Sequence, residues 1–352
     1  MQEKVKYAVV GCGGAGADHI KEISKIPEVE IAAICDIRPA VMVEIAKQFD
    51  VKNCYTDYSE LFAKENIDVA AIITSPDMHF RVALEAFDRG IDVICEKPLT
   101  LEPKDSWTLV AKAKEKERLL AVNFNYHFAK DTRRMKEIIE SGVLGDIEEI
   151  RYTILRGNEG EFKRHKTVEE QRFYDHLYTK SKGMIFDCGV HAFDLFCWFA
   201  QSAIKRIDAR GKSCLGYPYP DTAVAVFEFE NKIKAIYDYG RLPGFQFVEN
   251  ESINDAYFWI IVSGSKGSLV WKYSDGYANG EFVSTLRTYT ESGVEKETLP
   301  LYSKERYLQH KQFVESTKSR KLIGFFPSPE EAAKATDIAS KVVDICLQNT
   351  IF

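Results

Sequence analysis

The sequence predicts an α/β protein of two domains: a parallel-sheet domain at the N-terminus, followed by an α+β domain with a large, mostly antiparallel sheet. Three observations predict this class. Short apolar strands alternate with amphipathic helices as far as Asn123, and a glycine-rich turn follows the first strand. Beyond residue 147, strands of alternating or wholly apolar character predominate. A chain of 352 residues has room for two hydrophobic cores, which we expect over residues 1–123 and 124–352.

The first domain is expected to alternate strictly between strand and helix. Pro39 falls in the first turn of its helix, and Gly90 stands where a helix C-terminal glycine is expected. Repeated units of this length fold as parallel sheets with right-handed crossovers. The expected strands are 7–10, 31–35, 69–74, 93–95 and 119–123, and the expected helices are 15–25, 39–49, 78–88 and 103–116.

The second domain has a different pattern. A loop over 157–182, rich in charged and aromatic residues, precedes a helix that we expect to begin near His191. Hairpin turns are expected at Asn231-Lys232 and at Ser265-Lys266-Gly267. The expected strands are 147–155, 223–229, 233–239, 258–263, 268–273 and 284–290, and the further helices are 131–141, 304–319 and 328–348, the last with a capping box at Ser328 and Glu331.

The glycine-rich turn predicts a dinucleotide site. Tyr7 to Val10 run into Gly11, Gly13 and Gly16 at the G-x-G-x-x-G spacing. The first glycine permits a sharp turn, the second a close approach of backbone N–H groups to a pyrophosphate, and the third close packing of helix on strand. The helix that follows would direct its positive end at the phosphates. Alone, the motif fits a tight loop without a ligand equally well.

A second strand, Glu30 to Cys35, ends at Asp36, twenty residues after Gly16. A carboxylate at this position accepts hydrogen bonds from the adenine-ribose hydroxyls and repels a 2′-phosphate. The two signals together predict a Rossmann domain that binds NAD, although Arg38 leaves binding of NADP as an alternative. Ligands of such sheets bind beyond the carboxyl ends of the strands. This rule adds Ser75, Pro76, His79, Glu96 and Lys97 to the expected site.

Composition argues against several classes of protein. The net charge of −6 and the pI of about 5.8 do not indicate the basic surface that binds nucleic acid. No apolar run approaches the length of a membrane span, and the charged N-terminus enters the first strand without a signal-peptide core, so we expect no membrane partner. The eight cysteines form no C-x-x-C pair, which predicts reduced thiols in a cytoplasmic protein and no metal site.

Two further motifs carry a resemblance to a known family. Glu96-Lys97-Pro98 ends a strand of the Rossmann domain, and GMIFDCGVHAFDL runs from Gly183 to Leu195. With the glycine turn ending in His19, Ser75-Pro76 with His79, and the segment 141–145, the chain resembles the glucose-fructose oxidoreductase, inositol dehydrogenase and rhizopine catabolism (Gfo/Idh/MocA) family over nearly its whole length. The resemblance implies this cofactor-binding set: Gly11, Gly13, Gly14, Ala15, Gly16, Asp36, Ile37, Arg38, Thr74, Ser75, Pro76, His79, Glu96, Lys97 and Asn125.

The resemblance also implies an NAD(P)-dependent oxidoreductase that acts on a CH–OH group of a sugar, a cyclitol or a related polyol. In the family pattern Lys97 touches the reacting oxygen, His191 exchanges its proton and Asp187 assists. The chemistry agrees, because hydride removal from a carbinol needs a base for the hydroxyl proton, and the pKa of imidazole is about 6.5. A lysine beside the oxygen stabilises alkoxide character. The implied substrate-binding set is Lys97, Tyr126, Arg156, Asp187 and His191.

The sequence also allows purely structural roles for these residues. Lys97 is also what an exposed strand end provides, and Asp187 with His191 fits a helix-start pair in which Asp187 caps. Where many members have an arginine after the fifth strand, this chain has the run 123–127, which includes His127. We hypothesise that the loop over 157–182 forms a lid that recognises hydroxyls or an anionic group of the substrate. Its candidate residues are Arg156, Asn158, Lys163, Arg164, Tyr174, His176 and Tyr178.

Other functions compete with the dehydrogenase. The family includes glycosidases that use a retained NAD for transient oxidation and elimination, and ligand-sensing regulators without catalysis. A 2-hydroxy acid dehydrogenase of another Rossmann family would leave the Glu96-Lys97-Pro98 motif unexplained. The exposed face of the antiparallel sheet predicts a homodimer or homotetramer. Its candidate residues are Val224, Val226, Tyr237, Tyr239, Trp259 and Ile261.

Overall fold

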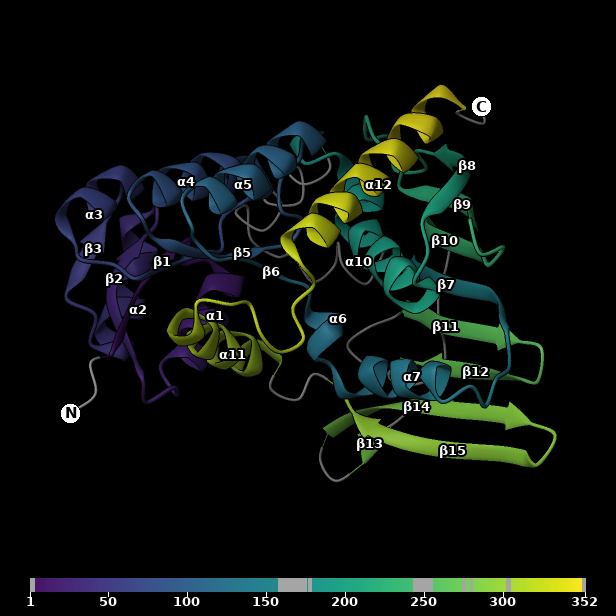
Figure 1. Ribbon diagram of the computed structural model, residues 1–352. Helices are drawn as coiled ribbons and strands as arrows, with labels where there is room; N and C mark the ends of the chain where they lie inside the picture. Colours follow the sequence, from purple (N-terminus) through teal and green to yellow (C-terminus); the bar gives the residue numbers. More distant parts are fainter. Residues whose placement is uncertain are drawn as a thin grey trace. The chain divides into compact units, whose positions relative to one another are not determined.

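The computed structural model describes residues 4–157, 176, 179–242, 256–273, 277–278, 281–301 and 305–349 (Figure 1). The chain forms two compact units. The first comprises Met1–Phe128 with Lys304–Asp337, and the second comprises Ala129–Ser303 with Ile338–Phe352. A late segment of the chain therefore belongs to the first unit, an arrangement that a single division of the sequence after residue 123 does not express.

The first unit is built on a six-stranded sheet in which every neighbouring pair is parallel, as the alternating pattern predicted. The strand order is β3-β2-β1-β4-β5-β6. The strands are β1 (Val5–Val10), β2 (Val29–Cys35), β3 (Asn53–Tyr55), β4 (Val69–Ile72), β5 (Asp92–Glu96) and β6 (Leu120–Asn123). The helices are α1 (Gly14–Ile23), α2 (Pro39–Phe49), α3 (Tyr58–Lys64), α4 (Pro76–Asp88), α5 (Pro103–Glu115), α6 (Asn125–Phe128) and α11 (Glu305–Ser319).

Helices cover both faces of this sheet, with α4 and α5 on one side and α1 and α11 on the other (Figure 1). On the second side, Tyr7, Ile20 and Phe313 are fully buried in one hydrophobic cluster, in which α11 supplies Phe313 and Val314. Burying one large apolar side chain contributes about 1.5–3 kcal/mol, so α11 is an integral layer of this unit.

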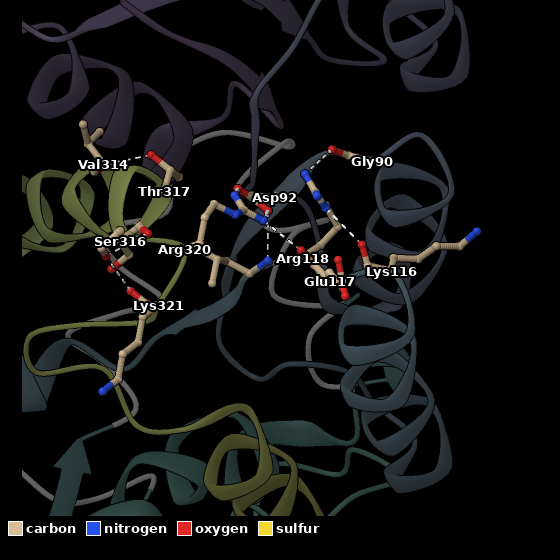
Figure 2. A network of polar contacts seen from close by, with 12 residues as sticks. Gly90, Asp92, Lys116, Glu117, Arg118, Val314, Ser316, Thr317, Arg320 and Lys321 are labelled. Atoms are coloured by element: carbon tan, nitrogen blue, oxygen red, sulfur yellow. Dashed lines mark hydrogen bonds and ion pairs between the residues drawn. The ribbon is translucent and has the colours of Figure 1, made fainter.

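Arg320, just after α11, fastens the segment to the start of β5. Its guanidinium binds the buried carboxylate of Asp92 through two nitrogens, and Nη2 also donates to the Glu117 carbonyl at 2.8 Å (Figure 2). Beside it, Arg118 donates to the Gly90 carbonyl at 3.1 Å. A carboxylate with two nitrogens of one guanidinium is a strong, directional pair, so the position of α11 along β5 is fixed at this end.

The second unit is built on a nine-stranded sheet, antiparallel except for the pair β7 and β10, as predicted. The order is β13-β14-β12-β11-β7-β10-β9-β8, with β15 beside β14. The strands are β7 (Ile147–Gly157), β8 (Ile204–Lys212), β9 (Thr222–Phe229), β10 (Lys234–Leu242), β11 (Ala256–Gly264), β12 (Gly267–Lys272), β13 (Tyr277–Ala278), β14 (Glu281–Thr290) and β15 (Gly293–Pro300). Helices α7 (Lys130–Glu140) and α10 (Gly183–Ala200) pack on it, and the boundary between the units falls within α12 (Pro329–Gln348).

The central helix α10 begins at Gly183, eight residues before the expected start near His191, so that expectation was wrong. Lys182 and Gly183 have positive φ and turn the chain into the helix. A long buried face, including Phe186 and Phe193, then packs on the sheet. α10 is long and apolar enough to cross a membrane, a run that was not expected from the sequence, but 72% of it is buried inside the protein and we assign it as a core helix.

The sheet face proposed for association needs a correction. Val224 and Val226 on β9 are 45% and 38% exposed, as expected for an open face, whereas Tyr237 and Tyr239 on β10 are fully buried. Side chains alternate along a strand, and the two tyrosines pair in register with the buried residues of β9 rather than with the two valines. Tyr237 stacks edge-on against Phe193 of α10. The two valines and the two tyrosines therefore lie on opposite faces of the sheet.

Candidate active site

The glycine turn between β1 and α1 has two positions where no side chain fits. Gly11 has φ +97°, and a Cβ atom there would lie 2.2 Å from the Ile73 carbonyl oxygen. A Cβ at Gly16 would lie 2.0 Å from the Gly11 carbonyl oxygen. Gly14, by contrast, has open space around it. The turn thus packs tightly on its inner side and leaves its outer side clear.

The start of α1 is suited to an anion. Its N-cap, Gly13, provides no side-chain cap, and the first turn contains no acidic residue. The first N–H groups of a helix have no carbonyl partner within it, and the macrodipole adds positive potential there. Gly14 and Ala15 are exposed. A pyrophosphate therefore fits this end of α1 by charge, by donors and by space.

Asp36 lies at the carboxyl end of β2 and is 7% exposed. Its oxygens accept hydrogen bonds from the backbone N–H groups of Cys12 and Arg38, both at 2.9 Å, and from two guanidinium nitrogens of Arg38 at 3.0 and 3.1 Å. Burial would raise the pKa of Asp36, but these hydrogen bonds outweigh it and the pKa is lowered. The ionised carboxylate stands beside Ile37, which is 84% exposed and offers an apolar surface to an adenine ring.

His79 contacts both the loop after β4 and the loop after β5. Its Nδ1 lies 2.9 Å from the Pro98 carbonyl oxygen and its Nε2 lies 3.1 Å from the Thr74 carbonyl oxygen. Burial lowers the pKa of His79 although both carbonyls oppose this, so the ring is neutral and donates to one of them. His79 is fully buried in the first turn of α4, after the partly exposed Ser75 and Pro76. It joins the two loops.

Glu96 anchors the lysine that follows it. Its Oε1 accepts a hydrogen bond from His19 Nε2 at 3.0 Å, and its Oε2 accepts one from the backbone N–H of Lys97 at 3.2 Å. Burial alone would raise the pKa of Glu96, but the hydrogen bond from His19 and neighbouring positive charge, including Lys97 and Arg306, lower it to about 2. Glu96 is therefore an anion at neutral pH, and Lys97 follows it in a partly exposed position.

The remaining predicted residues of the first unit lie in α6, directly after β6. Asn125 is partly exposed, and Tyr126 and His127 are 9% and 5% exposed. The carboxyl ends of β1, β2, β4, β5 and β6 thus carry the whole predicted cofactor set, because parallel strands all end at the same edge of the sheet.

Asp187 and His191 lie one turn apart within α10 of the second unit. Both are partly exposed, whereas Phe186 and Val190 beside them are buried, so the D-x-G-x-H spacing puts the two polar groups on one accessible face of a core helix. The alternative in which Asp187 caps this helix is wrong, because the N-cap is Lys182.

The lid hypothesis falls mostly on residues that the structure does not describe. Asn158, Lys163, Arg164, Tyr174 and Tyr178 lie outside the described residues. Arg156 is the penultimate residue of β7, and His176 is partly exposed.

One histidine next to the predicted set was not predicted from the sequence. His310 of α11 is fully buried, and its Nε2 lies 2.8 Å from His19 Nδ1. No local pattern marks it, because a lone histidine in a helix with an apolar face usually indicates a core position. Its partner in this contact, His19, was named from the sequence only as the residue that ends the glycine turn.

The glycine turn, the N-terminus of α1 and the ionised Asp36 define a dinucleotide-binding protein of Rossmann fold. Comparison with known families narrows this class. Residues 5–124 match the oxidoreductase family with an NAD-binding Rossmann fold, and residues 132–270 match the Gfo/Idh/MocA C-terminal domain. The chain therefore belongs to the Gfo/Idh/MocA family of NAD-dependent oxidoreductases, as its motifs indicated.

Individual relatives are distant. A myo-inositol 2-dehydrogenase of Thermotoga maritima is 24% identical over 75% of this chain and 74% of its own length. The D-glucoside 3-dehydrogenase of Escherichia coli is 24% identical over 64% of this chain and 67% of its own. Among solved structures, the scyllo-inositol dehydrogenase from Lactobacillus casei, with bound NAD(H) and scyllo-inositol, has a TM-score of 0.76 at 22% identity and covers 99% of both chains. This last likeness shows a shared fold.

The glycine geometry predicts opposite outcomes for two neighbouring substitutions. Gly16→Ala places a methyl group against the Gly11 backbone and should lower the free energy of unfolding by at least about 2 kcal/mol. Gly14→Ala meets no atom and favours helix, so stability should stay within about 0.5 kcal/mol or rise. Urea unfolding followed by circular dichroism measures both. Equal losses in the two variants would contradict this packing.

The hydrogen bonds to Glu96 predict a pH dependence of stability. Its folded-state pKa of about 2 lies below the ordinary 4.5, so its stabilising contribution is complete above about pH 4.5 and is lost as the pH falls towards 2. Glu96→Gln removes this contribution, and the free energy of unfolding should fall less steeply between pH 5 and 3. Glu28→Gln, at an exposed site, is the control and should keep the wild-type slope. A wild-type slope in Glu96→Gln would refute the assignment.

Proposed function

We propose that the protein catalyses NAD-dependent hydride transfer at a secondary hydroxyl of a cyclitol or a sugar, or the reverse reduction. The observation that carries this proposal is the anchoring of Lys97: Glu96 holds its backbone N–H at the sheet edge that also bears the glycine turn and Asp36. The names of relatives support the substrate class, since they include inositol dehydrogenases and a glucoside dehydrogenase.

The chain has the groups that hold NAD. The open space at Gly14 and the uncapped start of α1 would hold the pyrophosphate, and the carboxylate of Asp36 would accept hydrogen bonds from the adenine-ribose hydroxyls. The bound nicotinamide supplies the acceptor for the hydride. Because Asp36 is anionic, it repels a 2′-phosphate, and we expect NAD to be preferred to NADP even though Arg38 is beside it.

The protein's side chains then transfer the hydroxyl proton and stabilise the reacting oxygen. In this proposal the ammonium group of Lys97 donates to the reacting oxygen and stabilises the negative charge that develops there. His191 takes the hydroxyl proton, Asp187 assists from the adjacent turn, and Tyr126 and Arg156 contact substrate. Proton transfer by a positioned side chain contributes roughly 10²- to 10⁴-fold in rate.

The activity test is NADH formation at 340 nm across inositols, aldoses, glucosides and uronic acids, with NAD and separately with NADP. We expect turnover with one class of polyol, higher kcat/KM with NAD, and a loss of about 10²-fold or more in Lys97→Ala and His191→Ala. Lys104→Ala, at a surface lysine of α5, is the matched control and should retain full activity.

The outcomes separate the candidate reactions. Release of sugar from a glycoside without net NADH would replace the dehydrogenase by the NAD-retaining glycosidase. NAD binding with no turnover of any kind would favour a ligand sensor. Full activity in both Lys97→Ala and His191→Ala would refute the proposed roles.

We also propose that the protein forms a homodimer or homotetramer through the open face of the nine-stranded sheet. Val224 and Val226 lie exposed on adjacent same-face positions of β9, with Arg210 and Asp208 of β8 beside them in register. An apolar strip flanked by both signs of charge suits a self-complementary, two-fold contact with a second copy. Light scattering at micromolar concentration should give a multiple of 40.1 kDa, and Val226→Glu should lower it; a wild-type monomer would refute this proposal.

A further inference from the structure

Three side chains of the first unit form a continuous hydrogen-bonded chain. Glu96 Oε1 lies 3.0 Å from His19 Nε2, and His19 Nδ1 lies 2.8 Å from His310 Nε2. Both histidines are fully buried. The three residues come from β5, α1 and α11, so elements 291 positions apart in the sequence meet at His19.

The positions of the protons follow from the partners. The Glu96 carboxylate is ionised and only accepts, so His19 must carry its proton on Nε2. The Nδ1 atom of His310 has no hydrogen-bond partner among the described residues. A proton there would leave a buried N–H unpaired, which is costlier than an unpaired lone pair. His310 is therefore protonated on Nε2 and donates to His19 Nδ1. Both hydrogen bonds of this three-residue series thus have their donors directed towards Glu96.

The surroundings keep His310 neutral. Burial lowers the pKa of His310 well below its ordinary value, and positive charge, at His19 when that ring is protonated and at Arg306 on the same helix, acts in the same direction. The Tyr7 ring of β1 meets the His310 ring edge-on at 5.8 Å, and its buried hydroxyl has no partner among the described residues. Arg306 itself pairs with Asp18 of α1 at 3.4 Å. Among the described residues, no group of three or more His, Cys, Asp or Glu side chains is placed to hold a metal ion.

We propose that His310 is a positioning residue for Lys97. By donating to His19 it holds His19 in the tautomer that donates to Glu96 Oε1. This leaves Glu96 Oε2 to hold the backbone N–H of Lys97. The inference rests on the proposed function of Lys97. It means that a residue more than 200 positions away in the sequence helps to position Lys97.

The placement of α11 supports this role. Arg320, after the helix, binds Asp92 at the first residue of β5, and His310 within the helix reaches Glu96 at the last residue through His19. Two polar contacts therefore fix α11 against both ends of the strand that presents Lys97. Phe313 and Val314, buried between these two contacts in the sequence, hold the helix to the sheet.

The first experiment reads the protons directly and needs no activity. Long-range ¹H–¹⁵N spectra of the full chain labelled at its seven histidines, assigned with His310→Gln and His19→Gln, report which ring nitrogen is protonated. We expect both His19 and His310 to be neutral and protonated on Nε2 at pH 7. A proton on Nδ1 of His310, or a doubly protonated His19, would overturn the proposal.

The second experiment asks whether His310 acts through Lys97. His310→Leu removes the donor and should lower kcat about 10-fold or more with the KM for NAD little changed, because Asp36 and the glycine turn are untouched. His310→Gln keeps an N–H at the corresponding position and should recover activity to within about three-fold. Lys311→Ala, exposed on the same helix, is the control and should match the wild type.

The double variant separates positioning from a general loss of stability. If His310 acts through Lys97, adding His310→Leu to Lys97→Ala should cost no further turnover. Additive losses, or failure of His310→Gln to recover kcat in a folded protein, would overturn the inference. Full turnover in Lys97→Ala would refute the proposed function instead, and the histidine spectra would still decide whether His310 donates to His19.

Discussion

The hydrogen bonds that converge on the Glu96 carboxylate are the constraint on which the first unit depends. A carboxylate in a largely buried position is tolerated only when donors reach it. Here one donor is the backbone of the next residue, and the other is a histidine of the glycine-turn helix. The donors to this one anion connect α1 to β5, and the contact of His19 with His310 connects α11 to the same group of residues.

Local patterns in the sequence predicted the parts of the site that depend on local geometry. Glycines at a fixed spacing, a buried strand ending in an acid, and an E-K-P triplet at a strand end each follow from the backbone of a few residues. The strand β3 and the short helix α3 were not predicted. A strand of three residues is too short to show a periodic pattern, and the cap of α3, where Asp57 accepts a hydrogen bond from the Glu60 N–H, was overlooked. The contact of His19 with His310 joins distant segments, so no local pattern encodes it.

Two errors in the second unit have separate physical origins. The sequence shows that a strand is amphipathic or apolar, but which face is covered depends on its partners. Tyr237 and Tyr239 are large and apolar and were placed beside Val226, yet the register with β9 puts them on the buried face of the sheet, where Tyr237 contacts Phe193 of α10. The start of α10 was misplaced because its first turns are nearly all apolar, and an apolar run with no polar period resembles a buried strand as closely as a buried helix.

The two sets of proposed catalytic side chains are held in place by different physical means. Lys97 follows a short strand end and gains its position from hydrogen bonds, because a backbone amide bound to an anion tolerates little displacement. Asp187 and His191 instead project from a helix whose opposite face is packed against aromatic side chains of a large sheet. Close packing fixes such a helix without polar contacts, since any shift opens voids in the core. Substitutions near Lys97 should therefore act through the protonation and orientation of polar groups, whereas substitutions beneath α10 should act through volume.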